Sequence, residues 1–220
     1  MFEVVRLEDT VHIPPSEFGK PILEAATEEL NAKYPNKVII DLGLCIALHD
    51  IIRIGESQLY QGSAHQHALV EFRLVVFRPF VGEVLSGTVV SCDQQGVRMS
   101  LGFFDDIFIP SMLMMGGEMG GSSSWSEEEQ LWVWNVSEDD QLFLDLENPA
   151  RFRVSSVAYR RPAASAEARA PGTQAAGSGD SEPAAMQITA AIDHPGLGLI
   201  SWWPPEGDGD GDADGDGEDD

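Results

Sequence analysis

The chain has 220 residues, 43% of them hydrophobic, and a formal net charge of −24 at pH 7. That hydrophobic fraction is large enough to form a buried core, so disorder of the whole chain is excluded. The excess of carboxylates repels phosphate groups, which argues against strong non-specific binding to duplex DNA or to an anionic membrane. No apolar run approaches the roughly 20 residues that a membrane-spanning helix needs, and the charged N-terminal residues do not resemble a signal peptide.

The charge is unevenly distributed along the chain. Residues 1–81 carry seven basic and eleven acidic side chains, residues 82–205 carry six and seventeen, and residues 206–220 carry nine acidic side chains and no basic one. The two cysteines, Cys45 and Cys92, each lie in an apolar run. This is typical of buried thiols in a reducing compartment rather than of a disulfide framework. We therefore expect a cytosolic or nuclear protein.

Residues 1–80 are predicted to form an α+β domain that begins with a strand and a helix. An apolar run over residues 1–11 predicts the strand, which stops before Pro14 and Pro15 because proline cannot donate a backbone hydrogen bond. Ser16 is the predicted N-cap of a helix that continues to Tyr34. The apolar residues at helical spacing, expected to form its buried face, are Phe18, Ile22, Leu23, Ala26 and Leu30.

The same domain is predicted to end in a curved antiparallel sheet. Residues 37–54 and 69–80 are long apolar runs typical of β-strands, and residues 55–67 between them are polar enough for a hairpin loop. The stretch around Pro79 marks the boundary with a second domain.

Residues 82–110 have the pattern of the first strands of a small closed β-barrel. Predicted strands cover residues 83–91, 97–101 and 104–109, and Gln94 to Gly96 form a tight turn. Such strands must coil sharply, and Gly82, Gly87 and Gly96 relieve the crowding at the bends. This spacing favours the oligonucleotide-binding (OB) barrel, although another small β-barrel or a sandwich would use the same turns.

The rest of the chain is predicted to complete this barrel, as a domain of residues 81–205. A flexible loop over residues 111–124 is followed by strands over residues 130–136, 141–146 and 151–159. Residues 160–185 are rich in Ala, Pro, Gly and Ser and are predicted to be a disordered insertion. A strand pair formed by residues 186–192 and 196–203 should then seal the barrel. Residues 206–220 repeat Gly and Asp and are predicted to be a disordered acidic tail.

The barrel carries the residue types with which OB folds bind single-stranded nucleic acid, namely aromatic rings for stacking and arginines for phosphate. Because alternate positions of a strand must face the core, about half of the aromatic residues should only pack. No lysine follows Lys37, so we expect at most weak, transient contact with single-stranded RNA. The candidate RNA-contacting residues are Arg98, Phe103, Phe104, Phe108, Trp132, Trp134, Arg151 and Arg153.

Other patterns in the sequence do not amount to a catalytic, cofactor or metal site. His65 and His67 lack the further ligands that a structural zinc site brings. The Asp-Gly repeat that begins at Asp208 lacks the hydrophobic eighth position and the final Glu of an EF-hand loop. Nucleophile elbow, P-loop and dinucleotide-binding motifs are also missing from the sequence. We therefore expect a protein that is not an enzyme and uses neither a cofactor nor a metal.

Six blocks of sequence together resemble the larger stalk subunit of eukaryotic RNA polymerase III. The Phe-Phe-Asp-Asp block at residues 102–110 and the closing Gly-Leu-Gly-Leu-Ile-Ser-Trp-Trp at residues 196–203 are specific to the polymerase III branch. The other blocks are residues 9–15, 43–46, 72–80 and 132–134.

The resemblance implies an N-terminal tip domain followed by an OB barrel, in a nuclear, non-catalytic subunit that dimerises with a smaller helical stalk partner. It also implies docking of the tip on the polymerase core, while the barrel meets nascent RNA or initiation factors during tRNA and 5S rRNA synthesis. His12 stands where the family usually has arginine. The candidate residues for core or partner docking are Phe2, Val4, His12, Pro14, Pro15 and Cys45.

Two alternatives share this architecture. The chain could be the stalk subunit of another RNA polymerase, which would lack the closing Trp-Trp block. It could also be a free-standing OB-fold RNA-binding protein, which should show a basic groove.

Overall fold

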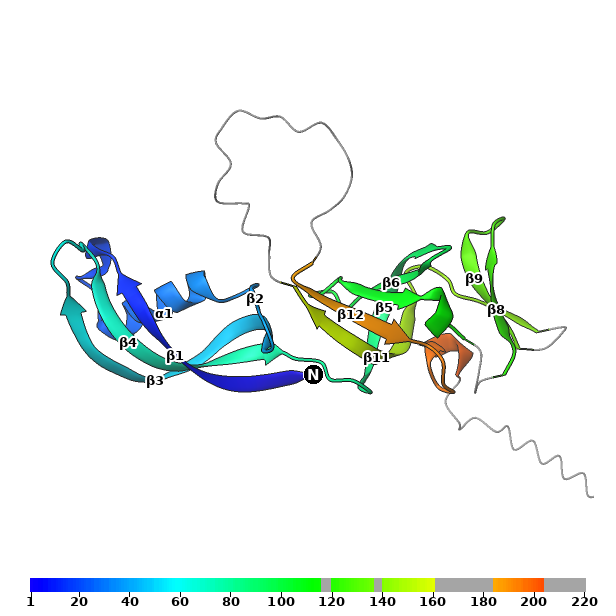
Figure 1. The fold of residues 1–220 in the computed structure, drawn as a ribbon, viewed down its shortest axis with the longest axis horizontal. Helices are drawn as coiled ribbons and strands as arrows, with labels where there is room; N and C mark the ends of the chain where they lie inside the picture. The colour runs from blue at the N-terminus through cyan, green and yellow to red at the C-terminus, as the bar shows by residue number, and fades with distance from the viewer. Residues whose placement is uncertain (116–119, 137–139, 161–183, 204–220) are drawn as a thin grey trace, which may run out of the picture.

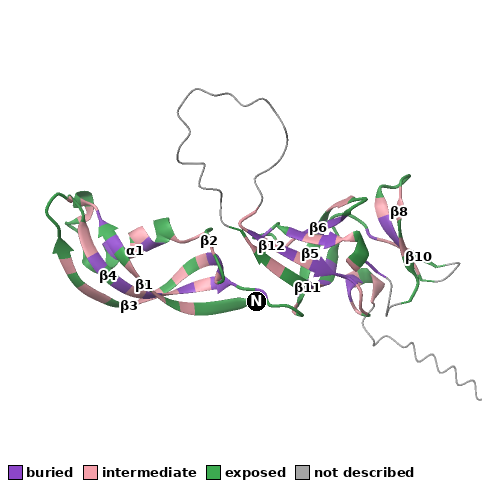
Figure 2. Cartoon of the chain, viewed as in Figure 1, coloured by how far each residue is buried: buried purple, intermediate pink, exposed green. Residues whose placement is uncertain are grey.

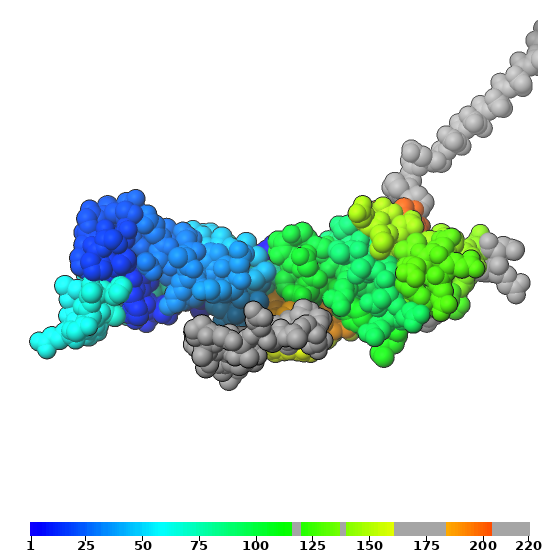
Figure 3. All heavy atoms as spheres, turned by 90° about the horizontal axis from the view of Figure 1, so that it is seen from above, coloured from blue at the N-terminus to red at the C-terminus, as the bar shows by residue number. Residues whose placement is uncertain are grey.

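The computed structural model describes residues 1–115, 120–136, 140–160 and 184–203. These residues form an elongated molecule (Figures 1 and 3), with an open N-terminal sheet at one end and a barrel at the other (Figure 1). The predicted insertion at residues 160–185 lies almost entirely outside the described residues, and the predicted acidic tail lies wholly outside them. No helix in the described part of the chain is both long and apolar enough to cross a membrane.

The N-terminal sheet, called the tip sheet from here on, has four antiparallel strands in the order β1-β4-β3-β2. Helix α1 (Ile22–Lys33) packs on one face of it, and the core between them contains Leu30 and Phe72. The predicted strand–helix–sheet order of this part is therefore confirmed. The strands are β1 (Phe2–Ile13), β2 (Val38–Ile39), β3 (Gly43–Leu59) and β4 (Gln66–Phe77).

The helix begins later than predicted, and Ser16 is not its N-cap. A 3-10 turn, η1 (Pro15–Glu17), comes first, and α1 is preceded by Pro21. Proline disfavours helical geometry in the residue before it, so one continuous helix through Pro21 is not formed. The expected buried face is confirmed for Ala26 and Leu30, which are buried, and wrong for Phe18, Ile22 and Leu23, which are exposed.

The hairpin loop predicted at residues 55–67 is mostly strand. Strand β3 continues to Leu59, β4 already begins at Gln66, and the turn occupies only residues 60–65. The polar residues in this stretch point to solvent at alternate positions of a strand. Polarity alone therefore could not distinguish a loop from an exposed strand. The pairing of β3 with β4 contains four register shifts.

The second region is a closed five-stranded barrel. Strand β5 pairs with β6, β6 with β7, β7 with β12 in parallel, β12 with β11, and β11 with β5. This ring, with its single parallel pair, agrees with the predicted OB fold. The strands are β5 (Val84–Asp93), β6 (Gly96–Ser100), β7 (Ile107–Pro110), β11 (Pro149–Tyr159) and β12 (Met186–Ala191).

The two C-terminal strands do not pair with each other as predicted. Strand β12 closes the ring between β7 and β11, whereas the two-residue strand β13 (Gly198–Leu199) pairs with β11 at Ala150 and Arg151. A 3-10 turn, η4 (Ile200–Trp202), follows β13. The last segment thus covers one end of the barrel instead of extending a hairpin. The buried residues lie along the barrel strands and along the tip sheet (Figure 2).

An additional three-stranded sheet lies between β7 and β11 in the chain, in the order β10-β9-β8. A 3-10 turn, η2 (Ser111–Leu113), leads toward it. The prediction of a flexible loop over residues 111–124 missed strand β8, because Ser122 to Ser124 carry no apolar alternation. The strands are β8 (Ser122–Ser126), β9 (Leu131–Asn135) and β10 (Gln141–Phe143).

Candidate RNA-binding and partner-binding surfaces

Arg98 and Phe108 lie next to each other on the outside of the barrel. Arg98 on β6 is the direct cross-strand partner of Phe108 on β7. Their neighbours Val97 and Ile107 point inward and are buried, so the alternation of the strands places Arg98 and Phe108 on the opposite, outer face. The strands corresponding to β6 and β7 form the face on which OB folds bind oligonucleotides. An arginine beside an aromatic ring on this face can contact a phosphate and a base at once.

Carboxylates surround this pair. Asp93, Asp105 and Asp106 line the same surface hollow as Arg98 and Phe108. Burial raises the pKa of Asp106, the charge of Asp105 raises it further, and Arg98 acts in the opposite direction. The positive charge of Arg98 is therefore largely balanced locally, and the surface attracts phosphate only weakly.

The other two candidate arginines differ from each other in what they contact. The guanidinium of Arg153 donates to both carboxylate oxygens of Asp193, at 2.9 and 2.8 Å, so it joins β11 to the segment after β12. Its charge is already paired. Arg151 is exposed on β11, and within the described residues it has no ion-pair partner. Arg151 is therefore the better candidate of the two for a phosphate contact.

Three candidate aromatic residues are packed inside the molecule. Phe104, Trp132 and Trp134 are all buried. The indole N–H of Trp132 donates to the backbone carbonyl of Asp93 at 2.8 Å, which attaches β9 to the barrel. The ring of Trp134 lies 5.8 Å from that of Trp202. Buried rings have no face to offer to a base, so we leave these three out of the RNA-binding proposal.

Phe103 and Phe2, one expected to contact RNA and the other a partner, contact each other where the barrel meets the tip sheet. The ring of Phe103 lies 5.6 Å from that of Phe2 and 5.1 Å from that of Phe77, the last residue of β4. The exposed fractions of Phe2 and Phe103 are 49% and 45%. This aromatic junction, consisting of Phe2, Phe77 and Phe103, therefore connects the two regions and remains partly open to solvent.

Hydrogen bonds reinforce the aromatic junction. The carboxylate of Glu83 accepts from the backbone N–H of Phe80 and forms an ion pair with the Met1 amino group at 2.7 Å. The backbone N–H of Val154 donates to the carbonyl of Glu83 at 2.8 Å. Strand β11 and the connection after β4 are thereby held to the start of β1.

The remaining docking candidates lie at different places on the tip sheet. Val4 and His12 are exposed on the face opposite α1, where the ring of His12 lies 4.4 Å from that of His67. Pro14 and Pro15 lie at the start of η1. Cys45 has no exposed surface, and burial raises the pKa of its thiol. A side chain without exposed surface cannot contact a partner, so Cys45 is not a docking residue.

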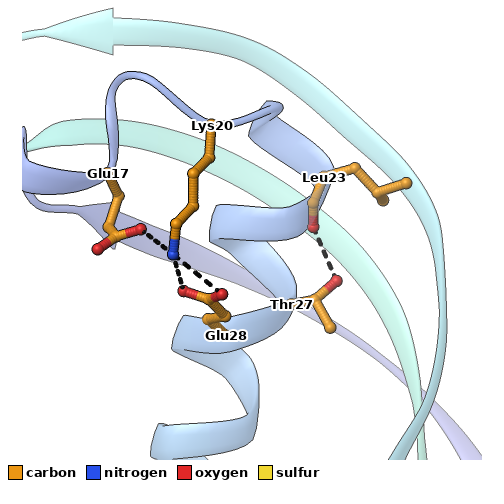
Figure 4. Close-up of polar contacts among 5 residues, drawn as sticks. All are labelled: Glu17, Lys20, Leu23, Thr27 and Glu28. Carbon is orange, nitrogen blue, oxygen red and sulfur yellow. Dashed lines mark hydrogen bonds and ion pairs between the residues drawn. The ribbon is translucent and has the colours of Figure 1, made fainter.

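Sequence reasoning missed an exposed apolar patch between η1 and α1, formed by Phe18, Ile22 and Leu23. Between Phe18 and Ile22 in the chain, the ammonium of Lys20 contacts the carboxylates of Glu17 and Glu28 (Figure 4). Hydrogen bonds to Glu17 and Glu28 raise the pKa of Lys20 above its ordinary value. We call Phe18, Ile22 and Leu23 the η1–α1 patch. The position of Pro21 was the signal that could have revealed it.

Within the described residues no group of three or more His, Cys, Asp or Glu side chains is arranged to hold a metal ion. The outer face of the barrel and the tip sheet carry single charges, exposed rings and exposed apolar side chains.

Comparison with known proteins decides the family. A family model described as RNA polymerase III subunit Rpc25 matches residues 83–203, and one for the SHS2 domain found in the N terminus of Rpb7p/Rpc25p/MJ0397 matches residues 8–64. The chain is 37% identical to DNA-directed RNA polymerase III subunit RPC8 of Bos taurus over 92% of this chain and 98% of that protein. It is 33% identical to RPC8 of Saccharomyces cerevisiae over 92% of this chain and 100% of that protein.

The chain belongs to the Rpc25 family of RNA polymerase III subunits. Stalk subunits of other polymerases match less of it. DNA-directed RNA polymerase subunit Rpo7 of Saccharolobus shibatae is 36% identical over 49% of the chain, and polymerase II subunit RPB7 of Saccharomyces cerevisiae is 31% identical over 52%. The predicted assignment to the polymerase III branch is confirmed, and the tip sheet and the barrel are the SHS2-like and OB-like parts of an Rpc25-family stalk subunit.

Proposed function

We propose that this Rpc25-family chain is a non-catalytic stalk subunit of nuclear RNA polymerase III that supports transcription initiation and contacts nascent RNA during tRNA and 5S rRNA synthesis. The observation that supports this most strongly is the match to RPC8 over nearly the full length of that relative, across both the tip sheet and the barrel. The surfaces described above are suited to binding.

Docking on the polymerase core is proposed to use the outer end of the tip sheet. The η1–α1 patch presents three exposed apolar side chains there, next to the ion pairs of Lys20. Pro14 and Pro15, at the start of η1, are proposed as further contacts. Permanent interfaces are hydrophobic, and these apolar side chains are ones that the chain itself leaves uncovered.

The smaller helical stalk partner is proposed to bind beside the aromatic junction. Phe2 and Phe103 are half exposed there, and Phe80 and Val81 in the connection after β4 are more exposed still. A partner covering these side chains would contact the tip sheet and the barrel together. The proposed division into a tip domain of residues 1–80 and a barrel domain of residues 81–205 places this surface at the boundary.

The barrel is proposed to guide RNA with low affinity. Arg98, Phe108 and Arg151 remain as the contacts, because Arg153 is paired with Asp193 and the buried aromatic residues have no accessible face. The carboxylates around Arg98 keep the affinity low. Initiation factors are proposed as further ligands of the same outer region.

The proposal is tested by purifying the C-terminally tagged chain from cells that express it and identifying co-eluting proteins by mass spectrometry. We expect core subunits of RNA polymerase III and a small helical subunit. The double variant Phe18→Asp with Leu23→Asp should lose the core subunits, because charge in the η1–α1 patch opposes an apolar interface. The matched control is the double variant Leu59→Asp with Tyr60→Asp, which places the same two charges on exposed residues of the β3–β4 hairpin. Recovery of the chain alone, or with another polymerase, would contradict the proposed function.

A further inference from the structure

The two edges of the tip sheet differ in regularity. Strand β1 pairs with β4 from Phe2 to Ile13 without a register shift, whereas β3, most of which lies beyond β2 at the opposite edge, contains four shifts. Bulges twist an edge strand and protect it from pairing with another chain. The β3 edge is therefore blunted, and the β1 edge keeps the regular, bulge-free geometry that can accept a further strand.

The hydrogen-bond pattern shows which backbone groups of β1 point away from β4. The N–H of Arg78 donates to the carbonyl of Met1, its directly opposite residue, at 2.8 Å. In a regular antiparallel pair, hydrogen-bonded and non-hydrogen-bonded positions alternate. The odd-numbered residues of β1 therefore bond to β4, and the even-numbered ones direct their N–H and C=O outward.

The outward backbone N–H and C=O groups of β1 lack hydrogen-bond partners in the described part of the chain only over the first part of this strand. The N–H of Thr10 is taken by the Asp9 carboxylate at 2.9 Å, which protects the edge at that point. In the described part of the chain, no hydrogen bond involves the outward groups of Val4, Arg6 or Glu8. The open edge thus covers residues 2–8, which we call the β1 edge.

We propose that the β1 edge accepts an extended segment of another polymerase subunit as a fifth strand of the tip sheet. Because the outward groups form a row along the strand, the one protein ligand that can bond to all of them in place of water is an extended backbone. Seven residues of strand span about 23 Å, so the bound segment has about that length. This inference rests on the proposed function, which supplies the assembly that contains the partner.

The side chains along the β1 edge define the chemistry of the segment. Val5 and Leu7 point to the α1 side and pack partly against the tip core, so alternate residues of the bound segment should be apolar there. On the other face Arg6 is already paired with Glu71. Glu8 has no ion-pair partner within the described residues, so a lysine or arginine of the segment should lie opposite it.

Hydrogen–deuterium exchange tests the proposal directly. The rates of the Val4, Arg6 and Glu8 amides should be compared in the isolated chain and in the purified polymerase that contains it. We expect these amides to exchange at least about tenfold more slowly in the polymerase. The Thr10 amide, already bonded to Asp9, and the odd-numbered amides, already bonded to β4, should change little.

A proline substitution supplies the second test. Arg6→Pro removes one outward N–H, and proline is tolerated on the free side of an edge strand. Arg6→Ala is the matched control, since it removes the same side chain and its Glu71 ion pair but keeps the N–H. We expect at least about a fivefold lower yield of bound polymerase for Arg6→Pro than for Arg6→Ala. In both variants the buried thiol of Cys45 should stay unreactive, which shows that the tip sheet remains folded.

Three outcomes would overturn the inference. Unchanged exchange of the Val4, Arg6 and Glu8 amides in the polymerase would show that nothing pairs with the β1 edge. Equal yields for Arg6→Pro and Arg6→Ala would show that its N–H groups are not used. Protection that appears in the isolated chain as its concentration rises would make the occupant a second copy. If the wild-type chain recovers no polymerase at all, the proposed function fails first, which is distinguishable from each of these results.

Discussion

The tip sheet and the barrel are both built mainly of β-strands, but they differ in which chemical groups of those strands they expose. The barrel is a closed ring, so all five of its strands have partners on both sides. The tip sheet is open, with one regular edge and one face left uncovered by α1. The strands of a closed barrel can bind only through their side chains, whereas an open sheet edge also offers backbone groups. This difference is why we propose permanent assembly contacts for the tip sheet and weaker, side-chain contacts for the barrel.

The largest expected effect is on the free energy of unfolding, and it tests whether the tip sheet and the barrel unfold separately. Phe72 in the tip core and Phe152 in the barrel core are both fully buried. Replacing either with Ala should lower the free energy of unfolding by about 3–5 kcal/mol. Phe77 and Leu44 of the tip sheet belong to the same hydrophobic cluster as the barrel core. We therefore expect each variant to destabilise both regions together.

Thiol labelling during urea denaturation can follow the two regions one by one. Burial raises the pKa of the Cys45 thiol in the tip sheet and, in the barrel, that of Cys92 to about 11. At pH 8 both thiols are therefore protonated and unreactive until their region opens. In each variant Cys45 and Cys92 should become reactive at the same urea concentration. Reactivity of Cys92 alone in Phe152→Ala would show that the regions are independent.

A second comparison tests how the last segment closes the end of the barrel. Gly198 and Gly196 both have positive φ, 93° and 85°. A Cβ on Gly198 would lie 2.3 Å from the ring of Trp202, whereas one on Gly196 would meet nothing within 4 Å. Gly196→Ala should therefore cost only backbone strain, about 1 kcal/mol. Gly198→Ala should lose about 1–3 kcal/mol more because of overpacking, measured by urea denaturation. Equal losses would show that Trp202 moves aside freely.

The smallest expected effect concerns RNA. Arg98→Glu should lower crosslinking of the chain to single-stranded RNA by about threefold, because one arginine on an acidic face contributes little to phosphate attraction. The matched control is Arg53→Glu, which makes the same charge change on the exposed part of the tip sheet and should leave crosslinking unchanged. Equal loss in both variants would mean that the contact depends on total charge and is not confined to the barrel.

Local patterns in the sequence were enough to predict the barrel. Gly96 illustrates this. A Cβ at this position would lie 2.0 Å from the carbonyl oxygen of Ile109, so the close approach of β6 and β7 requires glycine there. The alternation of apolar residues gave most strands to within a few residues. Strand β8 was missed because its serines are held as a strand only by pairing with β9, a contact that propensity does not contain.

The candidate surfaces were less predictable, because they depend on contacts between distant residues. Arg153 looked available for phosphate, but Asp193, forty residues later, occupies it. Phe2 and Phe103 were assigned to different surfaces and share one. Arg98 and Phe108, by contrast, come together through the register of β6 with β7, two strands that were predicted from the sequence without their register.

The parallel pairing of β7 with β12 has a consequence for synthesis on the ribosome. Every strand pair of the tip sheet lies within residues 2–77, so its strands can pair before the barrel closes. The barrel cannot close until Met186 to Ala191 are available to bridge β7 and β11. Until then β7 and β11 present unpaired edges on the growing chain, and transient edges of that kind are where chains aggregate and where chaperones bind. Late closure makes the barrel the region most dependent on protection during translation.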